Sequence, residues 1–348
     1  VPQITAVFGT CGDGMAVASA MSDFTFMESK KAKLFVNSPN ALEGNDASKC
    51  DTASAKFQSE EVGNVDVVAE EAELITKIRD LVSLLPANNE DDLSYMDCED
   101  DLNRVCADLE ASAADPAITL PMISDSGIFF ETKAEYGKDM VTGFIKLNGT
   151  TVGAVANRST LYDEEGNAVE EFNAEISARG CEKAAKFVEF CDAFNIPVLT
   201  LTNAAGFKAT KCSEKKMAAA AAALTYAFAE ATVPKVNVVV GKAYGSAYVT
   251  MNSKGLGADV VYAWPNAKIG MMGAKLAVKV MYPEADAKEL REKEAAYAEL
   301  QNSVASAAKR GYVDSVIEAQ DTRKYVIGAF EMLYTKREDR PFKKHGTV

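Results

Sequence analysis

The sequence predicts an α/β fold in which one strand–turn–helix unit occurs twice. The stretch VPKVNVVVGKAYGSAY at residues 233–248 resembles the start of the chain, VPQITAVFGTCGDGMA at residues 1–16, at an offset of 233 − 1 = 232. The match continues in two further pairs of segments, 22–27 with 258–263 and 32–39 with 267–274. Strands also alternate with helices through the second half of the chain, a pattern typical of a largely parallel sheet.

The first copy opens the chain. Its expected elements are a strand over 4–8, a turn over 9–14, a short helix over 15–22 and a strand around 24–27. A patch of lysines at positions 30, 31 and 33 follows, and a solvated loop is its expected role ahead of phosphate binding. An amphipathic helix over 69–85 comes next and is ended by Pro86.

A polar, acidic stretch over residues 87–121 marks the expected domain boundary. We therefore divide the chain into residues 1–116, which include this acidic linker, and residues 117–348. Because Val1-Pro2 lacks an initiator Met and leads directly into a strand, we expect the first unit to be a fragment or a processed half.

The second unit supplies the clearer periodicity. Asn148-Gly149 lies between two alternating runs and predicts a type I′ hairpin. The elements expected after it are a helix over 174–194, a strand over 198–202, an alanine-rich packing helix over 214–231, a strand over 233–240 and a helix from 245, with further helices over 283–311 and 314–333. A glycine-containing turn with Gly206 and Phe207 closes the 198–202 strand.

Composition narrows the function classes. A net charge of −14 without basic stripes argues against nucleic acid. No apolar run of about 18 residues is present, so we expect no membrane insertion. The seven cysteines are scattered and form no CxxC pair, which fits a reducing, cytoplasmic location better than a disulfide framework or a zinc site.

Few side chains of the sequence are suited to catalysis, so backbone N–H groups are the main candidates for stabilising a reaction intermediate. The single histidine, His345, lies in a basic tail, and the phosphate-binding and dinucleotide glycine motifs are absent. A buried strand that leads into a small-residue turn and a helix leaves unpaired N–H groups, which can form an oxyanion hole. The alternative is structural, with Gly241, Gly245 and Ser246 serving only a tight crossover.

Three runs resemble a known family: GKAYGSAYVTMNSKGLGADVVYAWPNAKIGMMGAKLAV, FCDAFNIPVLTLTNAAGF and GYVDSVIEAQDTRKYVIGAFEMLYTKREDRPFKKHG. Over nearly its whole length the chain resembles the carboxyltransferase (beta) subunits of biotin-dependent acyl-CoA carboxylases and decarboxylases, of the propionyl-CoA carboxylase beta type. The resemblance implies a duplicated crotonase-like (ClpP/crotonase superfold) ββα spiral with the first copy truncated. It places the active site between the first domain of one subunit and the second domain of another.

The resemblance also implies the site residues. Asp13 and Gly14 fall on the hole for the acyl-CoA thioester oxygen, and Ser246 and Ala247 on the hole for the biotin ureido oxygen. The residues expected to line the biotin and acyl pocket are Gly245, Tyr248, Val249, Gly206 and Phe207, besides Ser246 and Ala247. The family usually has Gly in place of Asp13 and Ser246. We expect the Asp13 side chain to cap its own helix, because a carboxylate aimed at the thioester oxygen would oppose the enolate.

The implied reaction is transfer of a carboxyl group between carboxybiotin, on a separate carrier, and an acyl-CoA such as propionyl-CoA or acetyl-CoA. Alternatives are the carboxyltransferase of an acyl-CoA decarboxylase, a crotonase-type hydratase with Asp13 as acid or base, and a non-catalytic scaffold subunit. The implied partners are a biotin carboxyl carrier, a biotin carboxylase subunit and further copies of the chain, a dimer or larger and by expectation a hexamer. The sequence has no MKM-type biotinylation site.

Overall fold

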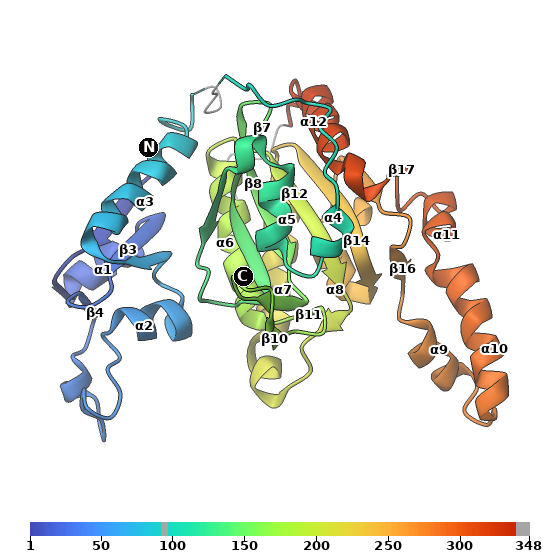
Figure 1. The fold of residues 1–348 in the computed structure, drawn as a ribbon. Coiled ribbons are helices and arrows are strands. Elements are labelled where there is room, and N and C mark those ends of the chain that lie inside the picture. Colours follow the sequence, from blue (N-terminus) through green and yellow to red (C-terminus); the bar gives the residue numbers. More distant parts are fainter. Residues whose placement is uncertain (92–96, 339–348) are drawn as a thin grey trace.

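The computed structural model describes residues 1–91 and 97–338 and has three parts (Figure 1). A small N-terminal unit, coloured blue, packs beside a central domain built on a large sheet. A helical arm, coloured orange, projects from the opposite side of the central domain. The chain is therefore α/β, as the alternation of strands and helices predicts.

The central sheet has the strand order β17-β15-β14-β12-β8-β7-β6, and β16 pairs with the far end of β14. Its strands are β6 (Phe129–Thr132), β7 (Met140–Leu147), β8 (Thr150–Asn157), β12 (Val198–Ala204), β14 (Lys235–Tyr244), β15 (Val260–Ala263), β16 (Lys268–Gly270) and β17 (Ser315–Val316). The strands β6, β7 and β8 are antiparallel, and all pairs from β8 to β17 are parallel. Asn148 (φ 49°) and Gly149 (φ 74°) join β7 to β8, which confirms the predicted hairpin.

Helices cover both faces of this sheet. The main ones are α5 (Pro116–Ile123), α6 (Ala178–Ala193), α7 (Lys211–Glu230), α8 (Gly245–Thr250) and α12 (Thr322–Leu333). One core contains Phe144, Val188 and Leu224 and lies under α6 and α7, and the other contains Ile123, Trp264 and Val326 and lies under α5 and α12. Two small pairs complete the domain, β9 (Thr160–Tyr162) with β10 (Ala168–Glu171), and β11 (Glu175–Ile176) with β13 (Gly206–Phe207).

The helical arm follows β16. It consists of α9 (Ala274–Met281), α10 (Ala287–Tyr297) and the π-helical turn Ala298–Asn302, and α11 (Val304–Lys309) leads back to the sheet. In α10 no residue is buried, and in α9 only Ala277 and Val278 are. The arm therefore stands largely clear of the domain core (Figure 1).

The N-terminal unit reproduces half of this design. It contains β1 (Ile4–Val7), β2 (Thr10–Gly12), α1 (Gly14–Ala20), β3 (Phe24–Glu28), β4 (Lys33–Phe35), α2 (Ala55–Phe57), β5 (Val67–Ala69) and α3 (Glu71–Leu84). The register is the same in both copies: Ile4 pairs with Phe24 as Val236 pairs with Val260, and Thr10 pairs with Lys33 as Lys242 pairs with Lys268. The duplication read from the sequence is confirmed at the level of strand pairing. One expectation was wrong, because residues 10–12 form strand β2 rather than part of a turn.

The acidic stretch leads to the short helix α4 (Leu109–Ser112) and contacts the central domain. Arg323 of α12 is fully buried and lies 2.7 Å from Asp125 and 3.5 Å from Asp100. The Cys106 N–H donates to the Gln320 carbonyl oxygen at 2.9 Å. The division at residues 116 and 117 stays a prediction, but residues from about 100 onward already pack with the second unit. Within the ranges described, no helix is long and apolar enough to cross a bilayer.

Candidate active site

Strand β14 positions the turn of the second copy. Its first half pairs with β12 and β15, and its last three residues pair with β16. At the change of partner, a Cβ on Gly241 would lie 2.5 Å from the Asn203 side-chain oxygen, so any larger residue would displace the Asn203 side chain. The Lys242 N–H donates to that same oxygen at 2.9 Å. The Asn203 side chain therefore fixes the bend, because it lies close to the Gly241 backbone and accepts the Lys242 N–H.

Helix α8 begins immediately after the bend. Gly245 has φ 57°, which glycine adopts readily, and a Cβ there would lie 3.0 Å from the Met271 carbonyl oxygen. Ser246 and Ala247 stand in the first turn, where N–H groups have no intrahelical acceptor. At the other end of α8, the buried Asn237 side chain donates to the Met251 carbonyl at 3.1 Å. The helix is anchored to the sheet at both ends.

The first copy has a similar backbone but a different residue at the entrance to its helix. Asp13 stands at the position of Gly245 and adopts φ 52° and ψ −126°, a region costly for a residue with a Cβ. Its side chain makes no capping hydrogen bond, so the expectation that Asp13 caps α1 was wrong. Its N–H donates to the Phe35 carbonyl oxygen at 3.0 Å, because the β2–β4 pairing continues one residue further. The Asp13 N–H is thus occupied, contrary to its expected role in an oxyanion hole.

The alignment of the two copies places the first oxyanion hole one residue further along the chain than the expected pair Asp13 and Gly14. The offset of 232 aligns Gly14 with Ser246 and Met15 with Ala247. Both Gly14 and Met15 occupy the first turn of α1, where N–H groups lack an intrahelical acceptor, and both are exposed. Sequence reasoning missed Met15, although the offset applied residue by residue identifies it.

The side chains after the second hole point in different directions. Tyr248 is buried in a cluster with Val239, Ala263 and Val313, and its hydroxyl has no hydrogen-bond partner among the described residues. Burial, with a contribution from nearby Asp314, raises the pKa of Tyr248 to about 12. Val249 is 44% exposed. Tyr248 therefore packs in the core, whereas Val249 is accessible to a ligand.

Gly206 and Phe207 lie beside α8. They form strand β13, which pairs with β11 and contacts α8. Phe207 is half-buried against the core under α6 and α7, and a Cβ on Gly206 would meet no atom within 4 Å. The structure thus brings these two residues next to the helix that carries Ser246 and Ala247, and their place in a substrate pocket stays a prediction.

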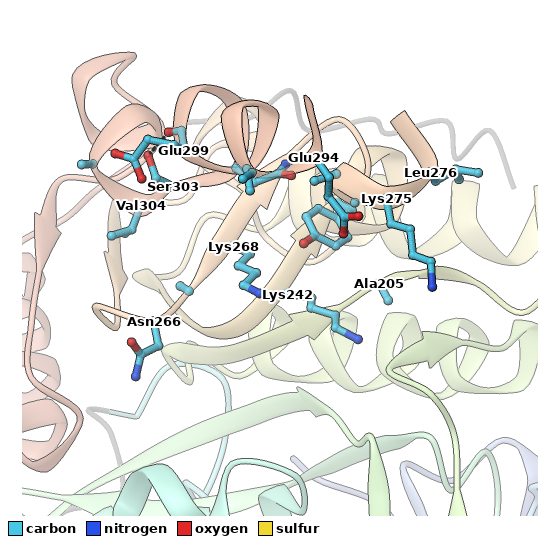
Figure 2. A pocket seen from close by; sticks show the side chains of 18 of the residues that line it. Ala205, Lys242, Asn266, Lys268, Lys275, Leu276, Glu294, Glu299, Ser303 and Val304 are labelled. Atoms are coloured by element: carbon cyan, nitrogen blue, oxygen red, sulfur yellow. Dashed lines mark hydrogen bonds between the residues drawn. The ribbon is translucent and has the colours of Figure 1, made fainter. Parts of the chain in front are cut away.

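A cavity of about 860 Å³ opens next to this turn, between the end of β14 and the helical arm (Figure 2). Lys242 and Tyr244 line it from alternate positions of β14, and Lys268 lines it from β16. Ala205, which directly precedes β13, also lines it. The second copy therefore combines a turn with free N–H groups and an adjacent basic hollow.

The other candidates carry no chemistry in this structure. Lys30 pairs with Glu70 at 2.5 Å, which fits a solvated loop. Lys33 instead begins strand β4 and pairs with Asp51 at 2.5 Å, so for this lysine the loop expectation was wrong. Within residues 1–91 and 97–338 no group of three or more His, Cys, Asp or Glu side chains could hold a metal ion. His345 lies outside the described residues.

Comparisons with known proteins agree over the whole chain. A family model described as the carboxyl transferase domain matches residues 1–348. The chain is 36% identical to the carboxyltransferase subunit of propionyl-CoA carboxylase from Haloferax mediterranei, over 100% of this chain and 69% of that protein. It is 35% identical to methylmalonyl-CoA decarboxylase subunit alpha from Propionigenium modestum, with the same two coverages.

Solved structures similar to this chain also include a carboxyltransferase. The chain superposes on transcarboxylase 12S, described as a hexamer assembly with hydrolysed methylmalonyl-coenzyme A bound, with a TM-score of 0.92 and 35% sequence identity. The match covers 100% of this chain and 68% of that one. The chain thus spans about two thirds of the length of these relatives.

Proposed function

Because the chain belongs to the carboxyl transferase family, we propose that it transfers a carboxyl group between carboxybiotin on a carrier protein and an acyl-CoA. The observation that carries the proposal is the repeated turn with a shared register, in which two helices each begin with free N–H groups. Such a transfer passes through two oxyanions, one on the thioester and one on the ureido ring. Two copies of an N–H pair match those two charges.

We assign the two turns to the two oxyanions. The Ser246 and Ala247 N–H groups bind the ureido oxygen, and the Gly14 and Met15 N–H groups bind the thioester oxygen. These donors are backbone groups held by helix and strand, so they need no reorganisation as charge develops. The Asp13 side chain has no part as acid or base in this assignment, which disfavours a hydratase.

The substrates follow from the relatives. The similar proteins are named for propionyl-CoA and methylmalonyl-CoA, so a short acyl-CoA and its α-carboxylated form are the proposed pair. One relative is a carboxylase subunit and another a decarboxylase subunit. Both directions use the same two N–H pairs, and the partner that loads or unloads biotin in the cytoplasm sets the direction.

We propose that the working form is a homo-oligomer. In one chain α1 belongs to the N-terminal unit and α8 to the central domain, and the two helices lie well apart (Figure 1). Both N–H pairs can act on one reaction only if a second copy brings its α1 to the α8 of the first. Transcarboxylase 12S is described as a hexamer, which makes a hexamer the proposed assembly.

The test is transfer of label. Methylmalonyl-CoA or malonyl-CoA, labelled in the free carboxyl group, is incubated with the chain and a biotinylated carrier domain, and label on the carrier is counted. We expect transfer that depends on biotin. Ser246→Pro, which removes one N–H where the first helical turn tolerates proline, should reduce the rate by about 100-fold or more.

Ser246→Ala is the matched control, because it removes the hydroxyl and keeps the N–H. It should stay within about threefold of the wild-type rate. If the folded wild-type chain moves no label from either acyl-CoA, carboxyl transfer is wrong for this chain, and the scaffold role takes its place.

A further inference from the structure

The cavity beside α8 is lined by an excess of positive charge. Its charged lining residues are Lys242, Lys268, Lys275 and Lys279, against Glu294 and Glu299 from the arm (Figure 2). None of these four lysines forms a salt bridge with any residue in the described ranges. The chain as a whole carries a net charge of −14, so the positive charge of this cavity is opposite in sign to that of the whole chain.

Lys242 and Lys268 are register partners on the neighbouring parallel strands β14 and β16. Like charges at paired strand positions repel each other and destabilise the pairing. Figure 2 shows both side chains within the cavity between the strands and the arm. Packing alone gives no reason for this pair, and a local conflict of this kind points to a function.

The first copy shows how the fold neutralises the same position. Lys33 occupies the place of Lys268 and pairs with Asp51 at 2.5 Å. Lys33 bridges to Ser54 and Lys268 bridges to Ser303, so Asp51, three residues before Ser54, corresponds to Leu300. Leu300 is 64% exposed and offers no charge. The second copy therefore has the lysine without its acidic partner.

Asn302 adds an acceptor to the same cavity. Its side chain is 2% exposed, and its Nδ2 donates to the Met272 carbonyl oxygen at 3.1 Å. That bond fixes the amide orientation, and the buried Oδ1 has no hydrogen-bond partner among the residues described. A buried, unpaired oxygen costs free energy unless a donor fills the site. The cavity thus offers ammonium groups and one acceptor for an N–H.

We propose that this cavity is the subsite for an oxyanion of a substrate, a phosphate or carboxylate carried on a group with an N–H donor. Lys242 and Lys268 bind the oxyanion, and Asn302 Oδ1 accepts the N–H. The identity of the ligands rests on the proposed function. Two substrate parts have this chemistry, the phosphorylated adenosine end of an acyl-CoA and a carboxylated ureido ring, and the volume of about 860 Å³ admits either.

Calorimetric titration of the full chain tests the subsite without turnover. Adenosine 3′,5′-bisphosphate is the phosphate probe, and N-carbamoylglycine, which has a carboxylate and ureido N–H groups, is the carboxylate probe. We expect at least one probe to bind, and Lys268→Gln to weaken that binding about tenfold. Asn302→Asp, which replaces the amide by a charge of the wrong sign, should weaken it further. Lys309→Gln, an exposed lysine of α11 outside the cavity, is the control and should leave binding unchanged.

The outcomes separate the two sources and the two proposals. Loss of bisphosphate binding alone assigns the subsite to the nucleotide end of CoA, and loss of N-carbamoylglycine binding alone assigns it to the carboxylated ureido ring. The subsite is overturned if neither probe binds, or if Lys268→Gln, folded by circular dichroism, binds both as Lys309→Gln does. If Lys268→Gln also transfers carboxyl groups with unchanged KM for acyl-CoA and carrier, the subsite fails while the proposed function stands.

Discussion

The two copies of the strand–turn–helix unit share their strand register and differ at the residue that enters the helix. Both backbones take a positive φ there, 57° at Gly245 and 52° at Asp13. Glycine meets this requirement without strain, whereas aspartate pays a steric cost. Aspartate gains nothing local in return, since its side chain makes no cap. The duplicated backbone therefore fixes the conformation, and the side chain adapts to it.

The copies also differ in what surrounds them. In the second copy α8 packs against α7 and β13, and Ala247 and Tyr248 are buried. In the first copy Met15 and Val17 of α1 are 68% and 51% exposed. The same local unit is thus a core element in one place and a surface element in the other. Local sequence determines the turn, and its surroundings determine its exposure.

Removal of an N–H from the first copy should have the largest effect. Gly14 begins α1, and a Cβ on it would meet no atom within 4 Å, so side chains are tolerated there. Gly14→Pro removes the N–H proposed to bind the thioester oxygen, and we expect turnover to fall about 100- to 1,000-fold. Gly14→Ala keeps the N–H and should stay within about threefold. Equal activity of the two variants in the label-transfer assay would remove the first turn from the mechanism.

A change of Asp13 to glycine makes the first copy match the second. Relief of the positive-φ strain is worth about 1–3 kcal/mol, and the added backbone freedom of glycine costs about 0.5–1 kcal/mol. We therefore expect Asp13→Gly to stabilise the protein by about 1 kcal/mol in urea unfolding. This reverses the sign expected of a helix cap, because the structure contains no capping bond to lose.

Asp13→Ala separates strain from charge in that experiment. It removes the carboxylate but keeps a Cβ at φ 52°, so it should give none of the gain. If alanine stabilises as much as glycine, the carboxylate and not the backbone is the cause. A loss of stability with glycine would contradict the strain argument directly.

The sequence predicted what repetition and periodicity encode. The offset between residues 1–16 and 233–248 predicted the duplicated turn, and the Asn148-Gly149 pair predicted a hairpin that the structure contains. The crotonase-like fold, inferred by resemblance, is confirmed by the match to transcarboxylase 12S. These features depend on local chemistry or on long shared motifs, which one sequence displays.

The sequence alone could not predict hydrogen bonds between residues that are far apart in the chain. The Asp13 N–H looks free in a reading of adjacent residues, but its acceptor is the carbonyl of Phe35, set by a strand pairing across 22 residues. The orientation of Tyr248 likewise depends on Val313 and other distant residues of its cluster. The lysine pair in the cavity becomes visible only when β14 and β16 are placed side by side. Pairing partners therefore decide which of the expected site groups are available.

At the end of β3 and in the loop after it, the two copies use opposite chemistry. The register aligns Glu28 with Trp264. Trp264 is buried and donates to the Thr322 hydroxyl at 2.9 Å. Glu28 is also buried, and its Oε2 accepts N–H groups from Lys31 at 2.5 Å, Lys30 at 3.1 Å and Ala32 at 3.3 Å. These bonds, that of Lys31 first, lower the pKa of Glu28.

A carboxylate whose pKa is lower in the folded state stabilises the protein above its unfolded pKa, about 4.3, and this stabilisation is lost as the pH falls through the folded value. Glu28→Gln keeps the size and one acceptor oxygen but removes the charge. We expect it to lower Tm at pH 7, and the difference from wild type to narrow once the pH falls below about 4. Glu43→Gln, at an exposed carboxylate of the same unit, should shift Tm little at any pH. A deficit in Glu28→Gln that stays constant from pH 7 to pH 3 would mean that lost packing, and not the charge on Glu28, holds this loop in the first copy.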